Sequence, residues 1–195
     1  MEAVPIATPS TFCPGNICAM PASAWYSLYH LLERNIPDTA LSTRTSVFSS
    51  LGQPGITGKK RPCLIMRNDE GGCLVCVLCT FGGVDMQTLP KLMQDFLVPV
   101  FPTTRPDKTS LITTPPWESP GSKDQWIVAV PFPAALPTRL WTPVCKVELA
   151  DIVDFSQTCQ DLESRFRALG NAERHQLLDE VLVRKCSVVS LPQLR

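Results

Sequence analysis

One short stretch restricts the fold more than any other part of the chain. Two apolar runs, RPCLIMR (61–67) and CLVCVLCTF (73–81), flank NDEGG (68–72), which has the composition of a tight turn. The second run is apolar throughout and is bounded by glycine pairs, as is typical of a strand buried on both faces. Pro62 lies near the start of its strand, where a missing N–H is tolerated. The stretch therefore predicts an antiparallel β-hairpin.

Further strands and helices are indicated on both sides of this hairpin. Apolar periodicity predicts strands at 16–22, 124–132 and 139–149, and helices over 23–35, 85–97, 156–169 and 172–185. Gly170 is suited to end the third of these helices, and Asn171 to cap the fourth. Residues 35–60 and 98–123 lack a sustained period and are rich in residues that favour loops, so they are predicted to be long connections.

These elements predict an α+β protein with a β-rich domain and a helical end. Residues 1–13 are predicted to be a flexible leader, residues 14–155 the β-rich domain, and residues 156–195 a helical hairpin with a tail. A chain of 195 residues with 44% hydrophobic residues is long and apolar enough to bury a core of this size.

Charge and leader composition narrow the function classes. The 18 basic and 18 acidic residues cancel, so any affinity for nucleic acid has to come from a local patch. The first residues lack the basic cluster and apolar core of a signal peptide, and no stretch reaches the length of about 18 apolar residues that spans a bilayer. We therefore expect a soluble, cytoplasmic protein with reduced cysteines and no membrane partner.

The three cysteines of the hairpin resemble a metal-binding string but have the wrong geometry for one. Cys73, Cys76 and Cys79 are spaced three apart on a predicted strand, whose side chains alternate between two faces. Cys73 and Cys79 should share a face and Cys76 should point to the other, so the three thiolates cannot meet at one metal ion. His30 and His175 lie far away on predicted helices. We expect no metal and no cofactor, and cysteines that serve as small buried residues.

The open end of the hairpin is the most promising place for chemistry. The midpoint between Arg61 and Thr80 falls inside the predicted turn, so the two residues should be cross-strand neighbours. A guanidinium beside a hydroxyl suits a phosphodiester, and Lys59, Lys60 and Arg67 are further basic residues nearby in the sequence. The alternative is a solvated hairpin end with no chemical role.

Four short motifs resemble those of the MazF/PemK-like toxins, a family of small SH3-like barrels. PGNI (14–17) is similar to the family's opening strand, KRPCLIM (60–66) to its Arg-Pro strand, and CVLCT (76–80) to the strand that ends in threonine. VELADIV (147–153) is similar to a late segment that precedes a helix. The resemblance implies an SH3-like β-barrel with insertions at 23–60 and 84–123.

The resemblance also implies an activity, a site and partners. It implies a metal-independent endoribonuclease that cleaves single-stranded RNA by attack of the ribose 2′-hydroxyl on the adjacent phosphate. Arg61 would stabilise the developing charge, or act as an acid, and Thr80 would position the phosphate or water. Lys59, Lys60 and Arg67 would bind the RNA. Since the family forms dimers, a homodimer is expected.

A second function class stays open at this point. The family often carries an acidic residue in the loop before the arginine, whereas residues 52–60 contain none. The 84–123 insertion and the C-terminal helices could also cover the groove of the barrel. The alternative is therefore a catalytically inactive barrel that binds a protein or RNA partner.

Overall fold

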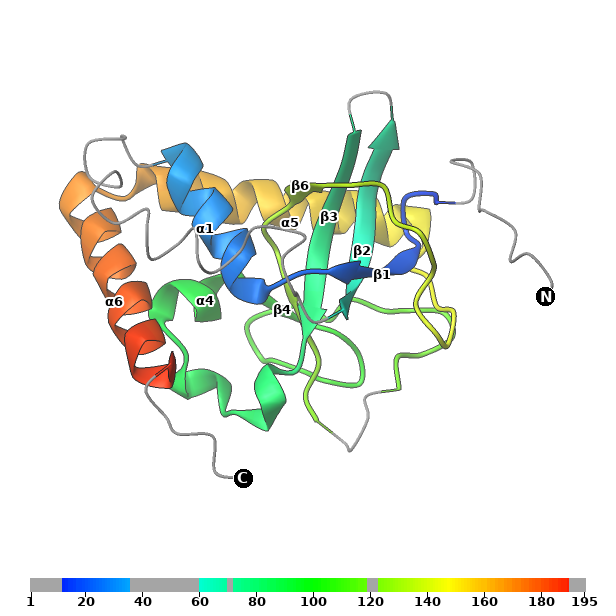
Figure 1. Cartoon of the computed structure of the whole chain (residues 1–195), viewed down its shortest axis with the longest axis horizontal. Helices are drawn as coiled ribbons and strands as arrows, with labels where there is room; N and C mark the ends of the chain where they lie inside the picture. Colours follow the sequence, from blue (N-terminus) through cyan, green and yellow to red (C-terminus); the bar gives the residue numbers. More distant parts are fainter. Residues whose placement is uncertain (1–11, 36–59, 70–71, 119–122, 190–195) are drawn as a thin grey trace.

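The computed structural model describes residues 12–35, 60–69, 72–118 and 123–189 and shows an α+β protein (Figure 1). Its strands, in chain order, are β1 (Ile17–Pro21), β2 (Lys60–Asp69), β3 (Gly72–Cys79), β4 (Leu97–Pro99), β5 (Trp126–Val128) and β6 (Phe132–Ala134). They form an antiparallel six-stranded sheet in the order β1-β2-β3-β5-β4, with β6 also paired to β3. The expected α+β class is confirmed. The strand ladder does not close, so the expected SH3-like barrel is not confirmed.

The predicted hairpin is present, and it contains one irregularity. Next to the turn, Asp69 pairs with Gly72 and Arg67 with Leu74, which is the register that the sequence predicts. A bulge between Ile65 and Arg67 then shifts the pairing by one residue, so that Ile65 faces Val75. Because the side-chain period of a strand is two, this shift of one residue moves the side chains of β2 beyond the bulge to the opposite face of the sheet from the one that an unbroken register would give them.

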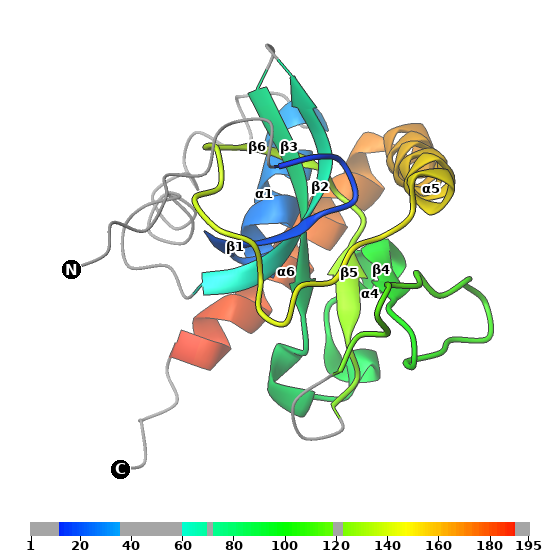
Figure 2. The ribbon, with the colours of Figure 1, turned by 90° about the vertical axis from the view of Figure 1, so that its right-hand side faces the viewer.

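Helices cover the sheet on two sides (Figures 1 and 2). The helices of the described residues are α1 (Ala24–Asn35), α4 (Lys91–Phe96), α5 (Leu149–Ala168) and α6 (Asn171–Val189). Ser23 caps α1, because its Oγ accepts a hydrogen bond from the N–H of Trp25 at 3.3 Å. The carbonyl of Gly170 accepts the first bond of α6, from Arg174 at 3.0 Å, so Gly170 rather than Asn171 precedes this helix.

The two faces of the sheet belong to two hydrophobic clusters. On one face, alternate residues of β1, β2 and β3 pack with α1, α4, α6 and the end of α5; we call this the helix-covered face. On the other face, the intervening residues pack with the first half of α5 and with residues 98–117; we call this the inner face. From Val75 to Cys79, the residues of β3 on both faces are buried, as predicted for this apolar run, whereas Leu74 near the turn is half-buried.

Three predicted elements differ from the structure. The helix expected over 85–97 is shorter, because Pro90 stands at its N-cap and α4 begins at Lys91. The strand expected over 124–132 is divided into β5 and β6 around Pro131, which has no N–H to donate. The strand expected over 139–149 has only single bridges, at Leu140 and Lys146.

The helix α5 begins seven residues earlier than predicted, at Leu149 instead of Ser156. The alternation in 147–153 resembles a strand, but the buried residues Ile152, Phe155 and Cys159 have helical spacing. Leu149 and Val153 belong to the same alternation and are exposed. The expected boundary between a β-rich domain and the helical end therefore falls inside one helix that packs on the sheet.

The segment expected to be an unstructured loop at 98–123 has a structural role. The ammonium group of Lys108 donates hydrogen bonds to the carbonyls of Gln94, Asp95 and Leu97, at the end of α4. Arg105 donates to the Gln94 carbonyl at 2.8 Å. These bonds satisfy carbonyls that a helix end leaves unpaired, and they hold the loop against α4. In the described part of the chain, no helix has the length and apolarity needed to cross a membrane.

Candidate functional site

The open end of the hairpin is where the sequence places Arg61 and Thr80, and the register there differs from the prediction. The last bridged pair toward this end is Cys63 with Val77. Continued by two residues, this register places Cys79, not Thr80, opposite Arg61. Arg61 also pairs with Met20 of β1, which lies on the helix-covered face. The bulge at Met66 thus turns Arg61 toward this face, together with Cys63 and Cys79.

Arg61 is half-buried and its guanidinium is incompletely paired. Its Nε is buried and has no hydrogen-bond partner among the described residues. The nearby thiols do not supply a negative charge: burial raises the pKa of Cys79 to about 12, although the positive charge of Arg61 opposes the rise. Burial likewise raises the pKa of Cys63 well above its usual value. A buried donor without an acceptor is uncommon in proteins, and this atom is part of a charged group that forms strong hydrogen bonds with anions.

Thr80 lies just after β3, at the start of a strained turn. Its backbone leaves the strand with φ −107° and ψ −4°, and Phe81 follows with a positive φ of 48°. Gly82 and Gly83 also have positive φ, and the N–H of Gly83 donates to the Thr80 carbonyl at 2.9 Å. An αR residue followed by a residue of positive φ turns successive backbone N–H groups to one side, which is the arrangement of anion-binding loops. No hydrogen bond joins the Arg61 and Thr80 side chains in the described residues.

The three other basic residues of the predicted site do not form one patch. Lys60 is exposed and pairs with Pro21, next to Arg61. Lys59 lies outside the described residues. Arg67 lies at the turn end of β2, about 20 Å from Arg61 at the usual rise of a strand, and it forms an ion pair with Asp69 at 3.1 Å. Lys60 and Arg61 are therefore neighbours at this end of β2 whose side chains point to opposite faces, and Arg67 lies apart from both.

The cysteines lie as their alternation predicts. Cys73 and Cys79 belong to the helix-covered face, whereas Cys76 belongs to the inner face, where it interacts with Cys159 of α5. All three are buried. Within the described residues, no group of three or more Cys, His, Asp or Glu side chains is placed to hold a metal ion.

Burial of these thiols predicts a strong difference in reactivity at pH 8. Because alkylation needs the thiolate, Cys79, with a pKa of about 12, should react at least about a hundredfold more slowly than the exposed Cys13. Timed alkylation with iodoacetamide, followed by peptide mapping, measures both rates in one sample. After unfolding in guanidinium, the two rates should become similar. Equal rates in the folded protein would contradict the buried placement of Cys79.

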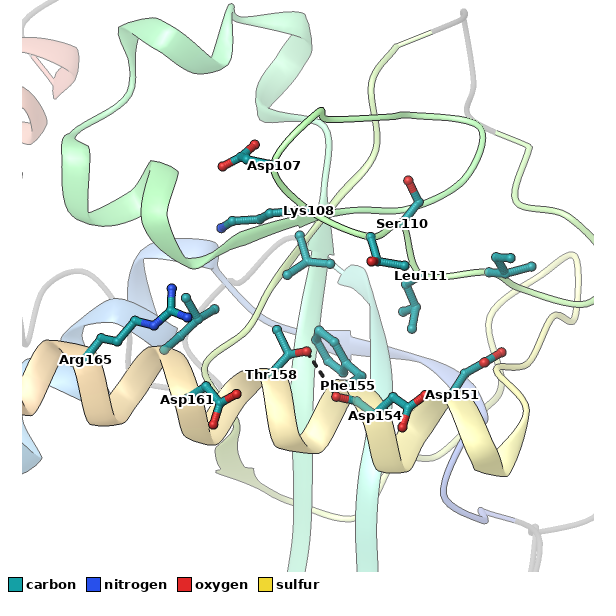
Figure 3. Close-up of a pocket in the computed structure, with 14 residues that line it drawn as sticks. Asp107, Lys108, Ser110, Leu111, Asp151, Asp154, Phe155, Thr158, Asp161 and Arg165 are labelled. Atoms are coloured by element: carbon teal, nitrogen blue, oxygen red, sulfur yellow. Dashed lines mark hydrogen bonds between the residues drawn. The ribbon is translucent and has the colours of Figure 1, made fainter.

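A groove that was not predicted from the sequence lies along α5 (Figure 3). It has a volume of about 390 Å³, with Asp151, Asp154 and Asp161 on the helix and Lys108 on the opposite loop. Phe155 contributes to its apolar floor. The three carboxylates follow each other along the helix and do not converge, so the groove lacks the ligand geometry of a metal site.

The two histidines have structural contacts. A ring nitrogen of His175 lies 2.8 Å from the Asn171 carbonyl within α6, and the His30 ring stacks on Tyr26 of α1 at a centroid distance of 6.4 Å. Neither histidine has a described contact with Arg61 or Thr80. The sequence did not predict the conformation of Phe81, because the positive φ of a phenylalanine is set by the strand end and the glycines that follow it.

Comparison with known proteins found no match: no protein-family model matches the chain, and neither a curated protein nor a solved structure matches it significantly.

Proposed function

We propose that this protein is a divergent relative of the MazF/PemK-like toxins that binds single-stranded RNA at the open end of the β2–β3 hairpin. Arg61 contacts a backbone phosphate, and Lys60 adds a second positive charge. The observation that carries the proposal is the buried Nε of Arg61, a charged donor without an acceptor in the described residues. Arg61 is only half-buried, and if its side chain turns so that this atom becomes exposed, a phosphate oxygen would satisfy it with a charge-assisted hydrogen bond.

Isolated bridges support the barrel that this family would require. Beyond the continuous ladder, Val100 bridges Leu111, Thr114 bridges Lys146, and Lys146 bridges Asn16, which precedes β1. Reciprocal hydrogen bonds of 2.8 and 3.0 Å join Thr114 to Lys146. These contacts run from β4, at one edge of the sheet, to β1 at the other, around the inner face. We interpret the sheet as an SH3-like barrel whose closing strands are reduced to single bridges.

The turn after β3 supports anion binding at the same end of the hairpin. Phe81 belongs to the helix-covered face, as Arg61 does. Thr80 and the two residues that follow it supply the backbone N–H groups of the proposed phosphate contact. A local site of this kind is compatible with a net charge of zero, because binding would depend on one strand end and not on the charge of the whole surface.

Cleavage is a second candidate function, favoured by the partial burial of Arg61. In the proposed reaction, the ribose 2′-oxygen loses its proton and attacks the adjacent phosphorus, and the bond to the 5′-oxygen breaks as that oxygen is protonated. A half-buried guanidinium stabilises the charge that develops on the phosphate more strongly than an exposed one. Among the described residues, no carboxylate or imidazole forms an ion pair or hydrogen bond with Arg61, so a catalytically inactive RNA-binding module is the simpler proposal.

The test for binding compares two arginines of the same strand. Arg61→Ala should weaken binding of a fluorescently labelled single-stranded RNA about tenfold, whereas Arg67→Ala, at the other end of β2, should change it less than twofold. Arg61→Ala should also reduce the slope of log K against log salt by about 0.7, the value for one phosphate contact on a single strand. Fluorescence anisotropy at several salt concentrations measures both quantities.

The same RNA separates binding from cleavage. Wild-type protein is incubated with labelled RNA in EDTA, and the products are resolved by electrophoresis. Products that disappear in both Arg61→Ala and Thr80→Ala would support the endoribonuclease. Binding without products would support the inactive module. If folded wild-type protein neither binds nor cleaves several RNA sequences at low salt, or if Arg67→Ala weakens binding as much as Arg61→Ala, the proposed site is wrong.

A further inference from the structure

At the open end of the hairpin, the bulge in β2 makes Lys60, and not Arg61, the cross-strand neighbour of Thr80. The register beyond the bulge places Arg61 opposite Cys79, and the positive charge of Arg61 acts on the Cys79 thiol, so these two residues are close. One residue further on, the same register places Lys60 opposite Thr80. Because side chains alternate along a strand, Lys60 and Thr80 lie on the side of the inner face, away from Arg61.

Arg139 reaches the same side of the sheet from a segment that is distant in the sequence. Leu140 bridges Cys18 of β1, and both residues pack on the helix-covered face. Arg139 precedes Leu140, and its carbonyl accepts a hydrogen bond from the N–H of Ala19 at 3.1 Å. Since neighbours along an extended segment point to opposite sides, the Arg139 side chain lies on the side of Lys60.

Lys123 approaches the turn after β3 from the other neighbour of that strand. Trp126 of β5 pairs with Cys79, and Lys123 lies three residues before it. The aliphatic part of Lys123 covers Gly83, because its Cδ and Cε lie 3.6 Å from the position that a Cβ on Gly83 would occupy. The N–H of Gly83 donates to the Thr80 carbonyl, so Lys123 flanks the turn that begins at Thr80.

These side chains have no partner within the described part of the protein. Lys60, Lys123 and Arg139 are exposed, and none of them forms an ion pair or a side-chain hydrogen bond with another described residue. The Thr80 hydroxyl is half-buried and forms no hydrogen bond with a described residue either. Three cations and a hydroxyl are therefore available to a ligand at one end of the sheet.

The three cations are spread in a line across the strands and do not converge. Four strand spacings separate the segment of Arg139 from that of Lys123, with β1, β2 and β3 between them, which is about 20 Å along the sheet. Two exposed carboxylates, Asp85 and Asp124, lie near the turn in the sequence, so positive charge is in excess once Arg61 is included. Charges spread over this length suit a chain of phosphates better than a single small anion.

We propose that Lys60, Lys123 and Arg139 form a basic strip that holds the phosphate backbone of single-stranded RNA as it crosses the end of the sheet. In the middle of the basic strip, the Thr80 hydroxyl and the Lys60 ammonium group donate to one phosphate. Lys123 and Arg139 contact phosphates on either side of it. This inference rests on the RNA binding proposed above, to which it adds two residues and the direction of the RNA across the strands.

The test compares single variants in the binding of a fluorescently labelled oligouridylate of about ten nucleotides. Lys123→Ala and Arg139→Ala should each weaken binding about threefold and reduce the slope of log K against log salt by about 0.7. Arg165→Ala is the matched control, because it removes the same charge from an exposed, unpaired arginine in the groove of α5, and it should change binding less than twofold. Lys123→Arg keeps the charge and should bind like the wild type.

A double-mutant cycle tests the neighbour of Thr80. Thr80→Val keeps the shape of the side chain but removes the hydroxyl, and it should weaken binding about threefold. Lys60→Ala and Thr80→Val should not be additive, because both remove a donor to the same phosphate. Arg139→Ala and Thr80→Val should be additive, since they act on different phosphates. Fluorescence anisotropy measures all these affinities, and circular dichroism confirms that each variant is folded.

The outcomes separate this inference from the proposed function. If Arg61→Ala weakens binding while Lys123→Ala and Arg139→Ala both behave like Arg165→Ala, the basic strip is wrong and RNA binding at Arg61 stands. Additive losses in Lys60→Ala and Thr80→Val would contradict the shared phosphate. Binding of phosphatidylserine vesicles but not of oligouridylate would overturn both proposals and make this end of the sheet a surface for lipid headgroups.

Discussion

Replacing Gly15 by alanine is expected to destabilise the protein by about 3 kcal/mol or more. The backbone of Gly15 has a φ of +92°, which side chains of L-residues rarely adopt. A Cβ at this position would lie 2.4 Å from the carbonyl oxygen of Val147. That oxygen cannot simply withdraw, because the N–H of Val147 donates to the Gly15 carbonyl at 2.8 Å. The N–H of Gly15 donates to the Ile65 carbonyl at 2.9 Å, so the backbone of Gly15 is held on both sides.

Gly72→Ala is the matched control for this substitution. Gly72 also has a positive φ, of +109°, but a Cβ added there meets no atom within 4 Å. The free energy of unfolding of this control should therefore fall by only about 1 kcal/mol, the cost of the backbone conformation. Guanidinium unfolding followed by circular dichroism measures both losses. If the two variants lose equal stability, the close approach of Gly15 to Val147 is not a feature of the folded protein.

Phe155→Ala is expected to reduce the free energy of unfolding by about 3 kcal/mol or more, the usual effect of removing a buried aromatic ring. Phe155 projects from α5 into the inner face of the sheet and is only 4% exposed. Without the ring, a cavity would remain between the helix and the strands, and α5 would lose a main contact with the inner face. Thermal or chemical unfolding measures the loss.

Val153→Ala provides the control on the same helix. Val153 is 62% exposed, so its truncation should change stability by less than about 0.5 kcal/mol. This pair of variants also tests where α5 begins. In a strand over 147–153, the apolar alternation would bury Val153, whereas the helix exposes Val153 and buries Ile152 and Phe155. A larger loss in Val153→Ala than in Phe155→Ala would contradict the helix.

The hairpin was predictable because its information is local. Apolar runs of strand length around a turn of Asn, Asp and Gly define β2 and β3, and the alternation of side chains places Cys73 and Cys79 opposite to Cys76. The same reasoning predicted the register correctly next to the turn. It did not predict the bulge, because a bulge reflects how β2 fits between β1 and β3 and leaves no mark in the composition of the strand.

The bulge changes the candidate site more than any other feature. A shift of one residue places Cys79 opposite Arg61, and it turns the guanidinium toward the helix-covered face. The expected grouping with Arg67 also fails, because neighbours in sequence lie far apart along an extended strand. Thr80 remains at the same end of the hairpin, but in a turn whose conformation depends on Phe81 and the two glycines.

The contact between Trp117 and Trp141 had no local signal in the sequence. Trp117 lies in the segment 98–123, which has no sustained period, and Trp141 lies in the segment 139–149, which was predicted to be a strand. They meet because Thr114 pairs with Lys146 and Trp141 bonds to β1. Contacts of this kind depend on how the connecting segments wrap the sheet, and no period or motif in the sequence describes that path.

The sequence by itself therefore determined the α+β class, the hairpin, the division of its cysteines between two faces and the existence of both C-terminal helices. These features follow from periodicity and turn residues, which act over a few positions. Only the tertiary structure decided the register at Arg61, the early start of α5, the isolated bridges of Lys146 to Asn16 and Thr114, and the contact of Trp117 with Trp141. Each of these depends on which distant segment packs against which, and the free energy of that packing is shared by residues far apart in the chain.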